Sequence, residues 1–189
     1  MLIADQFFRA SASAISSSAG RSMSMVQHIT SGNVLEQLLL ALQAFQVVFL
    51  WVHDWIPLGR LNDVAAVRSQ DTLPRLVAVT LAQSVPFTIG LFFSAWYFGQ
   101  PHPAWLGRWL WISYGILFVG QMRAWWVPYL FKAEPKRAER YEKMFGNTHS
   151  FLPERNGMVP NTAHILLHLS TAATLLVLFM RGFMAARRL

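Results

Sequence analysis

Two histidines lie one helical turn apart in the stretch VPNTAHILLHLS. The apolar residues around them predict a membrane-spanning helix, where an ionisable side chain has no water and no counter-charge and is therefore a candidate functional residue. Because His164 and His168 stand at positions i and i+4, one helix face can present both rings to a metal ion. Asp54, Glu154 or His149 would complete the ligand set, and mixed histidine and carboxylate ligands suit Zn, Fe or Mn. The candidate metal ligands are His164, His168 and His149.

A second chemistry needs no metal. His53 and Asp54 are neighbours at the end of the first apolar segment, and a carboxylate beside a histidine in a lipid-facing pocket can move a proton on and off a hydrophobic substrate. With Arg123, which lies at the same end of a later apolar segment, they are the candidate catalytic residues. Arg123 also has a structural explanation, because an arginine near a helix end commonly anchors the helix at the membrane surface.

The histidines have a structural explanation too, and the sequence favours it. Histidines near the start of a helix often satisfy its free backbone amides or the carbonyls of the preceding loop. The spacing of His164 and His168 is therefore a weak indication of a metal site on its own. Structural capping is the preferred interpretation, and metal binding is the alternative.

The composition indicates a membrane protein. The 189 residues are 54% hydrophobic and 13% charged, whereas a typical soluble domain carries about 25% charged residues. Because the chain contains no cysteine, it has neither thiolate ligands nor a dithiol relay, which excludes membrane thiol oxidoreductases. The net charge of +7 comes from loops and tails between apolar runs. We therefore expect anionic lipid headgroups as a partner, and not nucleic acid.

Four apolar segments determine the predicted fold, at 34–55, 76–98, 105–126 and 162–183. Each approaches the length of about 20 helical residues that crosses a hydrocarbon core of ~30 Å. Asn161 precedes the last segment and is a plausible N-cap. The fold class is therefore all-α, an integral membrane bundle of about four transmembrane helices.

Two further regions flank or interrupt these segments. Residues 1–33 are Ser-rich and predict a separate disordered or interfacial tail, whereas residues 34–189 form the transmembrane domain. Residues 132–159 begin with a charged, helix-forming half and continue with prolines and glycine, which predicts a short cytoplasmic surface helix and then an ordered turn region. Tryptophans at both ends of the third segment predict aromatic belts at the two membrane surfaces. They are Trp105, Trp109 and Trp111 at one end, and Trp125 and Trp126, with Tyr129, at the other.

Each predicted helix has one polar face. Because an unpartnered amide in hydrocarbon is costly, these faces should point into the bundle. Their residues are Glu36, Gln43, Gln46, His53 and Asp54 in the first segment, Thr80, Gln83, Gly90 and Ser94 in the second, Tyr114, Gln121 and Trp125 in the third, and Asn161, His164, His168 and Thr171 in the fourth. The histidines, Asp54 and Arg123 all fall at the long-loop ends of their segments, which predicts a shared polar pocket there.

The distribution of charge predicts the orientation. With four spans, both termini and the short link at 99–104 lie on one side of the membrane, and the two longer loops lie on the other. Ten of the 16 Lys and Arg residues fall on the side of the long loops. The positive-inside rule therefore places these loops in the cytoplasm.

Two classes of function follow. The leading hypothesis is a small multi-pass membrane protein that acts as an accessory or scaffold component, together with other membrane proteins or as a homo-oligomer. The alternative is a membrane-embedded enzyme that acts on a hydrophobic substrate through the histidines and Asp54, by metal-dependent or proton-transfer chemistry.

Overall fold

The computed structural model describes residues 34–187. The predicted tail at 1–33 and residues 188–189 lie outside the described part. The chain divides into two compact units, Met1–Gln37 and Leu38–Leu189. The described residues of the first unit are the opening turn of a helix, and the second unit contains the elements discussed below.

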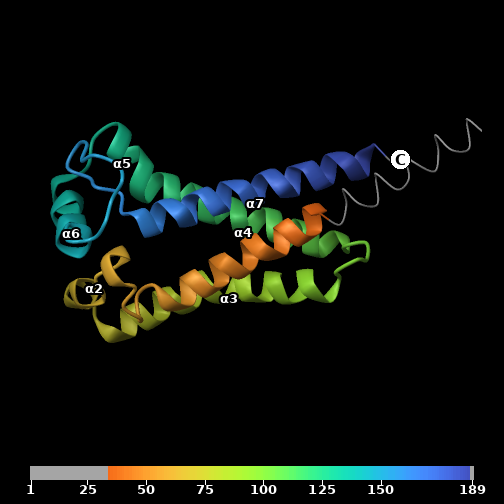
Figure 1. The fold of residues 1–189 in the computed structure, drawn as a ribbon, viewed down its shortest axis with the longest axis horizontal. Helices are drawn as coiled ribbons and strands as arrows, with labels where there is room; N and C mark the ends of the chain where they lie inside the picture. The colour runs from red at the N-terminus through yellow and green to blue at the C-terminus, as the bar shows by residue number, and fades with distance from the viewer. Residues whose placement is uncertain (1–33, 188–189) are drawn as a thin grey trace, which may run out of the picture. The chain divides into compact units, whose positions relative to one another are not determined.

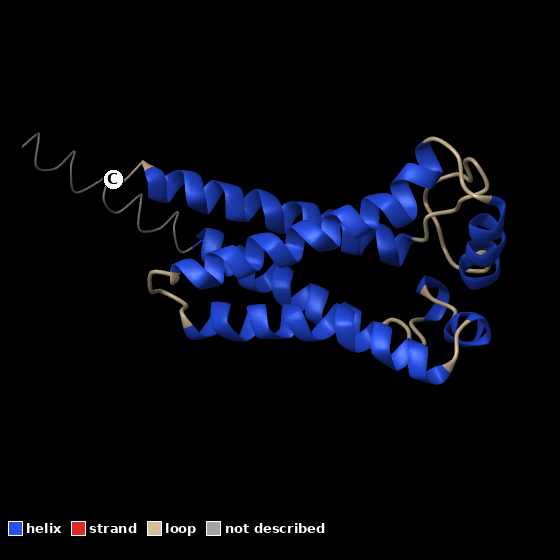
Figure 2. Cartoon of the chain, turned by 180° about the vertical axis from the view of Figure 1, so that it is seen from behind, coloured by secondary structure: helices blue, strands red, loops and turns tan. Residues whose placement is uncertain are grey.

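The regular structure of residues 34–187 is helical, apart from one isolated bridge between Arg155 and Met158 (Figure 2). In chain order the elements are the first helix Val34–Val52, η1 Gly59–Leu61, α2 Val64–Gln70, α3 Leu73–Trp96, α4 Ala104–Gln121, η2 Met122–Trp126, α5 Val127–Leu130, α6 Pro135–Phe145 and α7 Thr162–Ala186. Asn161 caps α7 as predicted, because its side chain accepts a hydrogen bond from the backbone N–H of His164.

In the second unit, the part of the first helix from Leu38 onward packs with α3, α4 and α7 (Figure 1). α4 contacts both α3 and α7. The first helix reaches α7 through a 2.8 Å hydrogen bond from Gln46 Nε2 to Thr174 Oγ1. It reaches α3 through a 3.0 Å bond from Trp51 Nε1 to Thr88 Oγ1. Gln46 belongs to a predicted polar face, whereas its partner Thr174 and the pair Trp51 and Thr88 lie outside the predicted faces.

Within residues 34–187, three helices are long and apolar enough to cross a membrane: the first helix, α3 and α7. α4 is shorter, at 18 residues, and its tryptophans and Arg108 lower its hydropathy. Its outward side chains are nevertheless apolar and exposed, since Ile116 and Val119 are 70% and 64% accessible. Comparable surfaces in water would be costly to expose. α4 therefore completes the predicted membrane bundle as its fourth helix.

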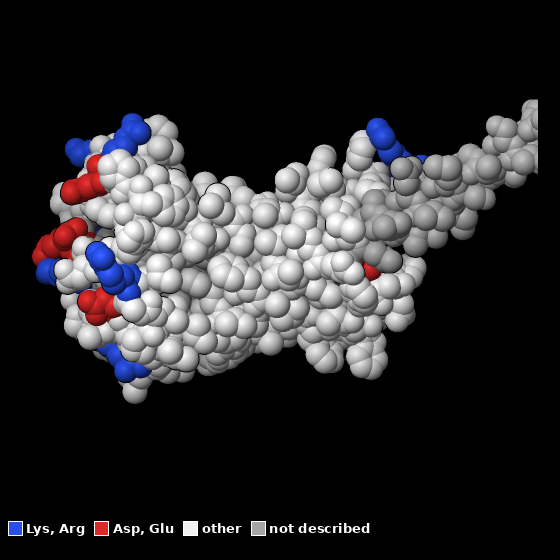
Figure 3. Space-filling model, in the orientation of Figure 1, with Lys and Arg blue, Asp and Glu red and all other residues white. Residues whose placement is uncertain are grey.

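Charged side chains gather at one end of the bundle. On the face drawn in Figure 3, lysine, arginine and carboxylate groups concentrate over the region of α2 and α6, and the helices beside them present uncharged atoms. α2 and α6 contact each other there. The ion pair between Arg140 and Asp71, with an N to O distance of 2.7 Å, joins α6 to the segment before α3. α6 is the short surface helix that the sequence predicts.

The two predicted aromatic belts differ in their exposure. Trp105, Trp109 and Trp111 are about two-fifths exposed on the surface of the bundle. Trp125 and Tyr129, by contrast, are only 5% and 7% exposed. They pack in a hydrophobic cluster with residues of α2, α3 and α6. The folded loops supply this cluster, which hydropathy alone does not reveal.

The helix predicted over 105–126 is interrupted by a π-helical turn, η2. Pro128 follows it, and a proline removes one N–H and crowds the preceding turn. The N–H of Val127 bonds to the carbonyl of Met122, five residues back. The carbonyl of Arg123 is thereby released, and it accepts a 3.0 Å hydrogen bond from Nη1 of Arg137. A side chain of α6 therefore satisfies the carbonyl group that the π turn releases.

Candidate functional site

A cavity of about 1250 Å³ lies at the charged end of the bundle. Its lining comes from the end of the first helix and from α2, α3, α4, η2, α6 and α7. Along α3 and α4 the wall is mainly apolar, with residues such as Val79, Ile112 and Ile116. Along α6 it is mainly charged. His53, Asp54, His164 and His168 are among the titratable residues that line it.

His164 has one ring nitrogen committed and one available. Its Nδ1 lies 2.6 Å from Oδ1 of Asn161, the same oxygen that caps the backbone N–H of His164. An amide oxygen only accepts, so Nδ1 carries the hydrogen. Within the described part of the chain, Nε2 has no hydrogen-bond partner. In the neutral ring, Nε2 therefore presents a lone pair.

His168 has the opposite arrangement. The indole Nε1–H of Trp126 donates to Nδ1 of His168 over 3.1 Å. An indole N–H only donates, so Nδ1 of His168 is the acceptor and Nε2 carries the hydrogen in the neutral ring. Among the described residues, this Nε2–H also has no partner. The two histidines thus offer one acceptor and one donor.

His53 and Asp54 contact each other just after the end of the first helix. His53 Nδ1 lies 2.9 Å from the carbonyl oxygen of Phe49, and His53 Nε2 lies 3.3 Å from Oδ2 of Asp54. Both ring nitrogens thus face oxygens, which places a proton either on Nε2 or on the carboxyl group. Burial raises the pKa of Asp54, and the charge of His53 offsets part of that rise. The pair can therefore hold or release a proton at the cavity wall.

Aromatic rings position the histidines. The ring of Trp125, in the π turn, lies over His164 with centroids 4.6 Å apart. Phe145 of α6 contacts His164 edge-on at 5.1 Å, and His53 contacts it edge-on at 5.6 Å. His164 is therefore held by side chains from three separate segments, which fixes the direction of its Nε2 atom.

The charged wall is basic. Its carboxylates are Asp54, Asp71 and Glu134, and they are outnumbered by its cations. The cations are Arg75, Arg123, Lys136, Arg137 and Arg140. Asp71 is paired with Arg75 at 3.2 Å and with Arg140 at 2.7 Å. Within residues 34–187, the side chains of Arg123 and Lys136 have no such ion pair or hydrogen bond. These two cations can therefore bind an anion without losing a protein partner.

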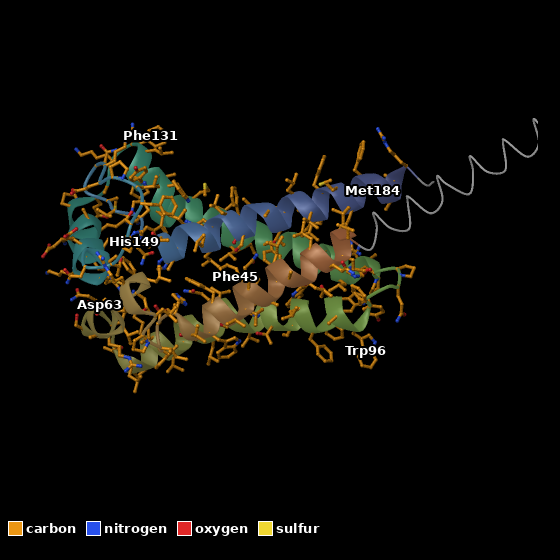
Figure 4. All side chains as sticks on the ribbon, viewed as in Figure 1. Phe45, Asp63, Trp96, Phe131, His149 and Met184 are labelled. Atoms are coloured by element: carbon orange, nitrogen blue, oxygen red, sulfur yellow. The ribbon has the colours of Figure 1, made fainter. Side chains whose placement is uncertain are left out.

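The candidate residues from the sequence divide into two groups. His53, Asp54, His164, His168 and Arg123 line the one cavity. His149 does not, and it lies in the loop at the charged end (Figure 4). Its Nδ1 lies 2.8 Å from Oγ1 of Thr162, at the start of α7.

The metal hypothesis finds no preformed ligand set in the structure. Residues 34–187 contain no group of three or more His, Asp or Glu residues arranged to hold a metal ion. Of the three candidate ligands, His149 stands apart from His164 and His168. The metal site itself stays a prediction.

Sequence reasoning does not find three contacts of this site. It places Trp125 and Trp126 in an aromatic belt, and Trp125 also on an inward polar face, but it predicts no contact of either with His164 or His168. It also makes no prediction for Asp71, which organises the basic wall. Pro128 shortly after the tryptophans was the available signal, because a proline within an apolar helix indicates a local break.

No known protein family matches the chain, and neither a curated protein nor a solved structure shows significant similarity to it.

Proposed function

We propose that the protein binds a membrane amphiphile with one apolar chain and an anionic headgroup. One observation carries the proposal: the cavity of about 1250 Å³ joins an apolar wall on α3 and α4 to a basic wall on α6 and η2. Ligand pockets commonly occupy about 300–1,000 Å³, so the space suffices for a chain and a headgroup. An apolar chain would lie along the helices, and the anion would lie against Arg123 and Lys136.

Native mass spectrometry of the detergent-purified protein tests the proposal with a matched pair of probes. Lysophosphatidic acid and monooleoylglycerol carry the same oleoyl chain but differ in charge. We expect the anionic probe to bind more tightly. A cation near the lipid headgroup contributes about 1 kcal/mol, so the double substitution Arg123→Gln and Lys136→Gln should weaken this preference by about 30-fold.

Two further variants separate headgroup binding from chain binding. Ala82→Trp fills the apolar wall and should weaken both probes, whereas Ala95→Trp, at the other end of α3 and outside the cavity, should weaken neither. Arg108→Gln removes an arginine that does not line the cavity and serves as the charge control. Equal binding of both probes to the wild type would contradict the proposal.

A second function is favoured by the opposite polarity of the two histidines. With an ester-bearing amphiphile in the cavity, Nε2 of His164 can accept a proton from an attacking water molecule. Nε2–H of His168 can donate a hydrogen bond to the oxyanion that develops at the carbonyl. The proton on His164 then passes to the leaving alkoxide oxygen. Water adds across the ester bond, and both histidines regain their starting state.

Hydrolysis of lysophosphatidic acid in H₂¹⁸O tests this second function, because one ¹⁸O atom should enter the released fatty acid. His164→Ala should abolish turnover while the affinity for the probe stays within a few-fold. Binding without turnover would leave the amphiphile-binding function alone. The accessory or scaffold role favoured by the sequence makes no use of the cavity, and it becomes the better explanation if neither binding nor turnover occurs.

A further inference from the structure

A row of polar side chains leads from the cavity into the interior of the bundle. Its members are Gln121, Thr171, Gln46, Thr174, Gln43 and Tyr114, and we call them the polar file. Each is buried, with accessibilities between 0% and 6%. Tyr114 precedes Gln121 by seven helical residues, which corresponds to about 10 Å along α4. The polar file therefore extends well below the level of the histidines.

Hydrogen bonds within the polar file follow one pattern. Gln121 Nε2 donates to Thr171 Oγ1 over 3.0 Å, and Gln46 Nε2 donates to Thr174 Oγ1 over 2.8 Å. Each threonine hydroxyl in turn donates to a carbonyl four residues earlier in α7, over 2.9 and 2.8 Å. The threonine hydrogens are thus used within the helix and cannot serve the glutamine oxygens.

Several polar atoms of the polar file have no hydrogen-bond partner. Among residues 34–187, Oε1 of Gln46 and Oε1 of Gln121 are buried without a partner, as are both amide atoms of Gln43 and the hydroxyl group of Tyr114. Gln43 lies beside the Tyr114 hydroxyl, yet the two groups do not meet hydrogen-bond geometry. Three amide oxygens, one amide nitrogen and one hydroxyl group, from the first helix and α4, are thus left to be satisfied by something other than their described neighbours.

We propose that the polar file is a water-binding site, in which bound water connects Tyr114 and Gln43 to the cavity at Gln121. Buried polar groups without protein partners are satisfied by water, which supplies two donors and two acceptors in the smallest volume. The bilayer offers no other source of hydrogens at this depth.

The position of Gln121 gives this water a destination. Gln121 lines the cavity together with His168, and its hydrogen bond to Thr171 holds it near the helical turn of α7 that carries His168. Water held in the polar file would therefore meet the cavity at the level of His168. The inference does not depend on which amphiphile occupies the cavity.

Radiolytic hydroxyl footprinting of the full-length protein tests the water site. X-ray pulses convert bound water into hydroxyl radicals that modify the nearest side chains, and mass spectrometry locates the modification. Tyr129 provides an internal control, because it is also a buried tyrosine, at 7% against 1%, does not line the cavity and donates its hydroxyl hydrogen to the carbonyl of Pro153. We expect Tyr114 to be modified several-fold faster than Tyr129. Equal rates for the two rings would overturn the proposal.

Two variants connect the signal to the polar file. Gln43→Leu and Gln46→Leu each remove an amide that would hold water, and each should reduce modification of Tyr114 toward the rate of Tyr129. Undiminished modification of Tyr114 in both folded variants would also overturn the proposal. If either variant loses its cooperative thermal transition, the comparison of the two rings in the wild type is used by itself to test the proposal.

Discussion

The indole N–H of Trp126 donates a hydrogen bond to Nδ1 of His168 over 3.1 Å. This contact joins the π turn to α7 and determines which nitrogen of His168 bears the hydrogen. The preceding residue, Trp125, covers His164 at a centroid distance of 4.6 Å. Two consecutive tryptophans therefore contact two histidines that lie one helical turn apart.

Replacing Trp126 with phenylalanine should allow His168 to adopt both neutral tautomers. Without the indole donor, Nδ1 competes with Nε2 for the hydrogen, and ¹⁵N NMR of histidine-labelled protein should show a mixture of both forms. The free energy of unfolding should fall by about 1 kcal/mol, as for an ordinary hydrogen bond. Trp51→Phe removes a comparable indole bond to Thr88 and should leave the His168 signals unchanged. An unaltered His168 spectrum in the Trp126 variant would contradict the assignment.

Asp54→Asn should change how stability depends on pH. Burial raises the pKa of Asp54 in the folded protein, so the folded state holds this proton more tightly than the unfolded chain. The resulting stabilisation is full below the unfolded pKa, near pH 4, and is lost as pH rises through the folded pKa. The melting temperature of the wild type, relative to that of the variant, should therefore increase between pH 7.5 and 4.5. A relative decrease over that range would reverse the sign of the shift.

Gly90→Leu should destabilise the contact between α3 and α4. A Cβ atom at this position would lie 3.0 Å from Cδ2 of Leu110, so a larger side chain must push the helices apart. Overpacking of this kind costs about 1–3 kcal/mol. Gly107→Leu is the matched control, because a Cβ atom there meets nothing within 4 Å. Thermal unfolding in detergent should distinguish the two, and equal melting temperatures would remove Gly90 from the helix contact.

Elemental analysis tests the metal prediction directly. If His164 and His168 bind Zn, Fe or Mn, the purified protein should contain the metal in near-stoichiometric amount and His168→Ala should lose it, since each ligand contributes a large share of the affinity. His149→Ala separates the candidates. Its ring faces Thr162, so we expect this substitution to leave the metal content as it is in the wild type. Loss of metal in the His149 variant would instead bring that loop into the ligand set.

The orientation in the membrane can be mapped with single cysteines, because the natural chain has none. Ser69 and Asn147 are exposed at the charged end, and Gln100 is exposed in the link between α3 and α4. An impermeant thiol reagent applied to intact cells should label Gln100→Cys. It should label Ser69→Cys and Asn147→Cys only after the membrane is opened. Labelling of Ser69 and Asn147 from opposite sides would rule out a four-helix crossing.

The helices were predictable from the sequence for a simple reason. Runs of apolar residues that must cross hydrocarbon have few alternatives to a helix, and the cap at Asn161 confirms the predicted start of α7. Polar faces also placed Gln43, Gln46 and Thr171 in the interior, where they are buried. These features depend on local periodicity, which a single chain displays.

The site depends on relations that local periodicity does not contain. A shift from an i+4 to an i+5 hydrogen bond leaves hydropathy unchanged, so the hydropathy pattern does not reveal the π turn at Met122–Trp126. The pairing of Asp71 with Arg140 joins residues 69 positions apart. Tyr129 looked like a membrane anchor because its burial depends on how residues after α5 fold back over it.

The π turn is equivalent to one extra residue inserted into a continuous α-helix. One residue corresponds to a rotation of about 100° around the helix axis, so deleting a single position between Met122 and Trp126 would return the backbone to a regular α-helix and shift the remaining side chains of the turn around the axis by about that angle. The contacts of Trp125 and Trp126 with the histidines thus depend on the angular position of these residues around the helix axis. Substitutions that preserve chain length do not change that position. A one-residue deletion can separate the membrane bundle from its aromatic contacts more cleanly than replacing any side chain.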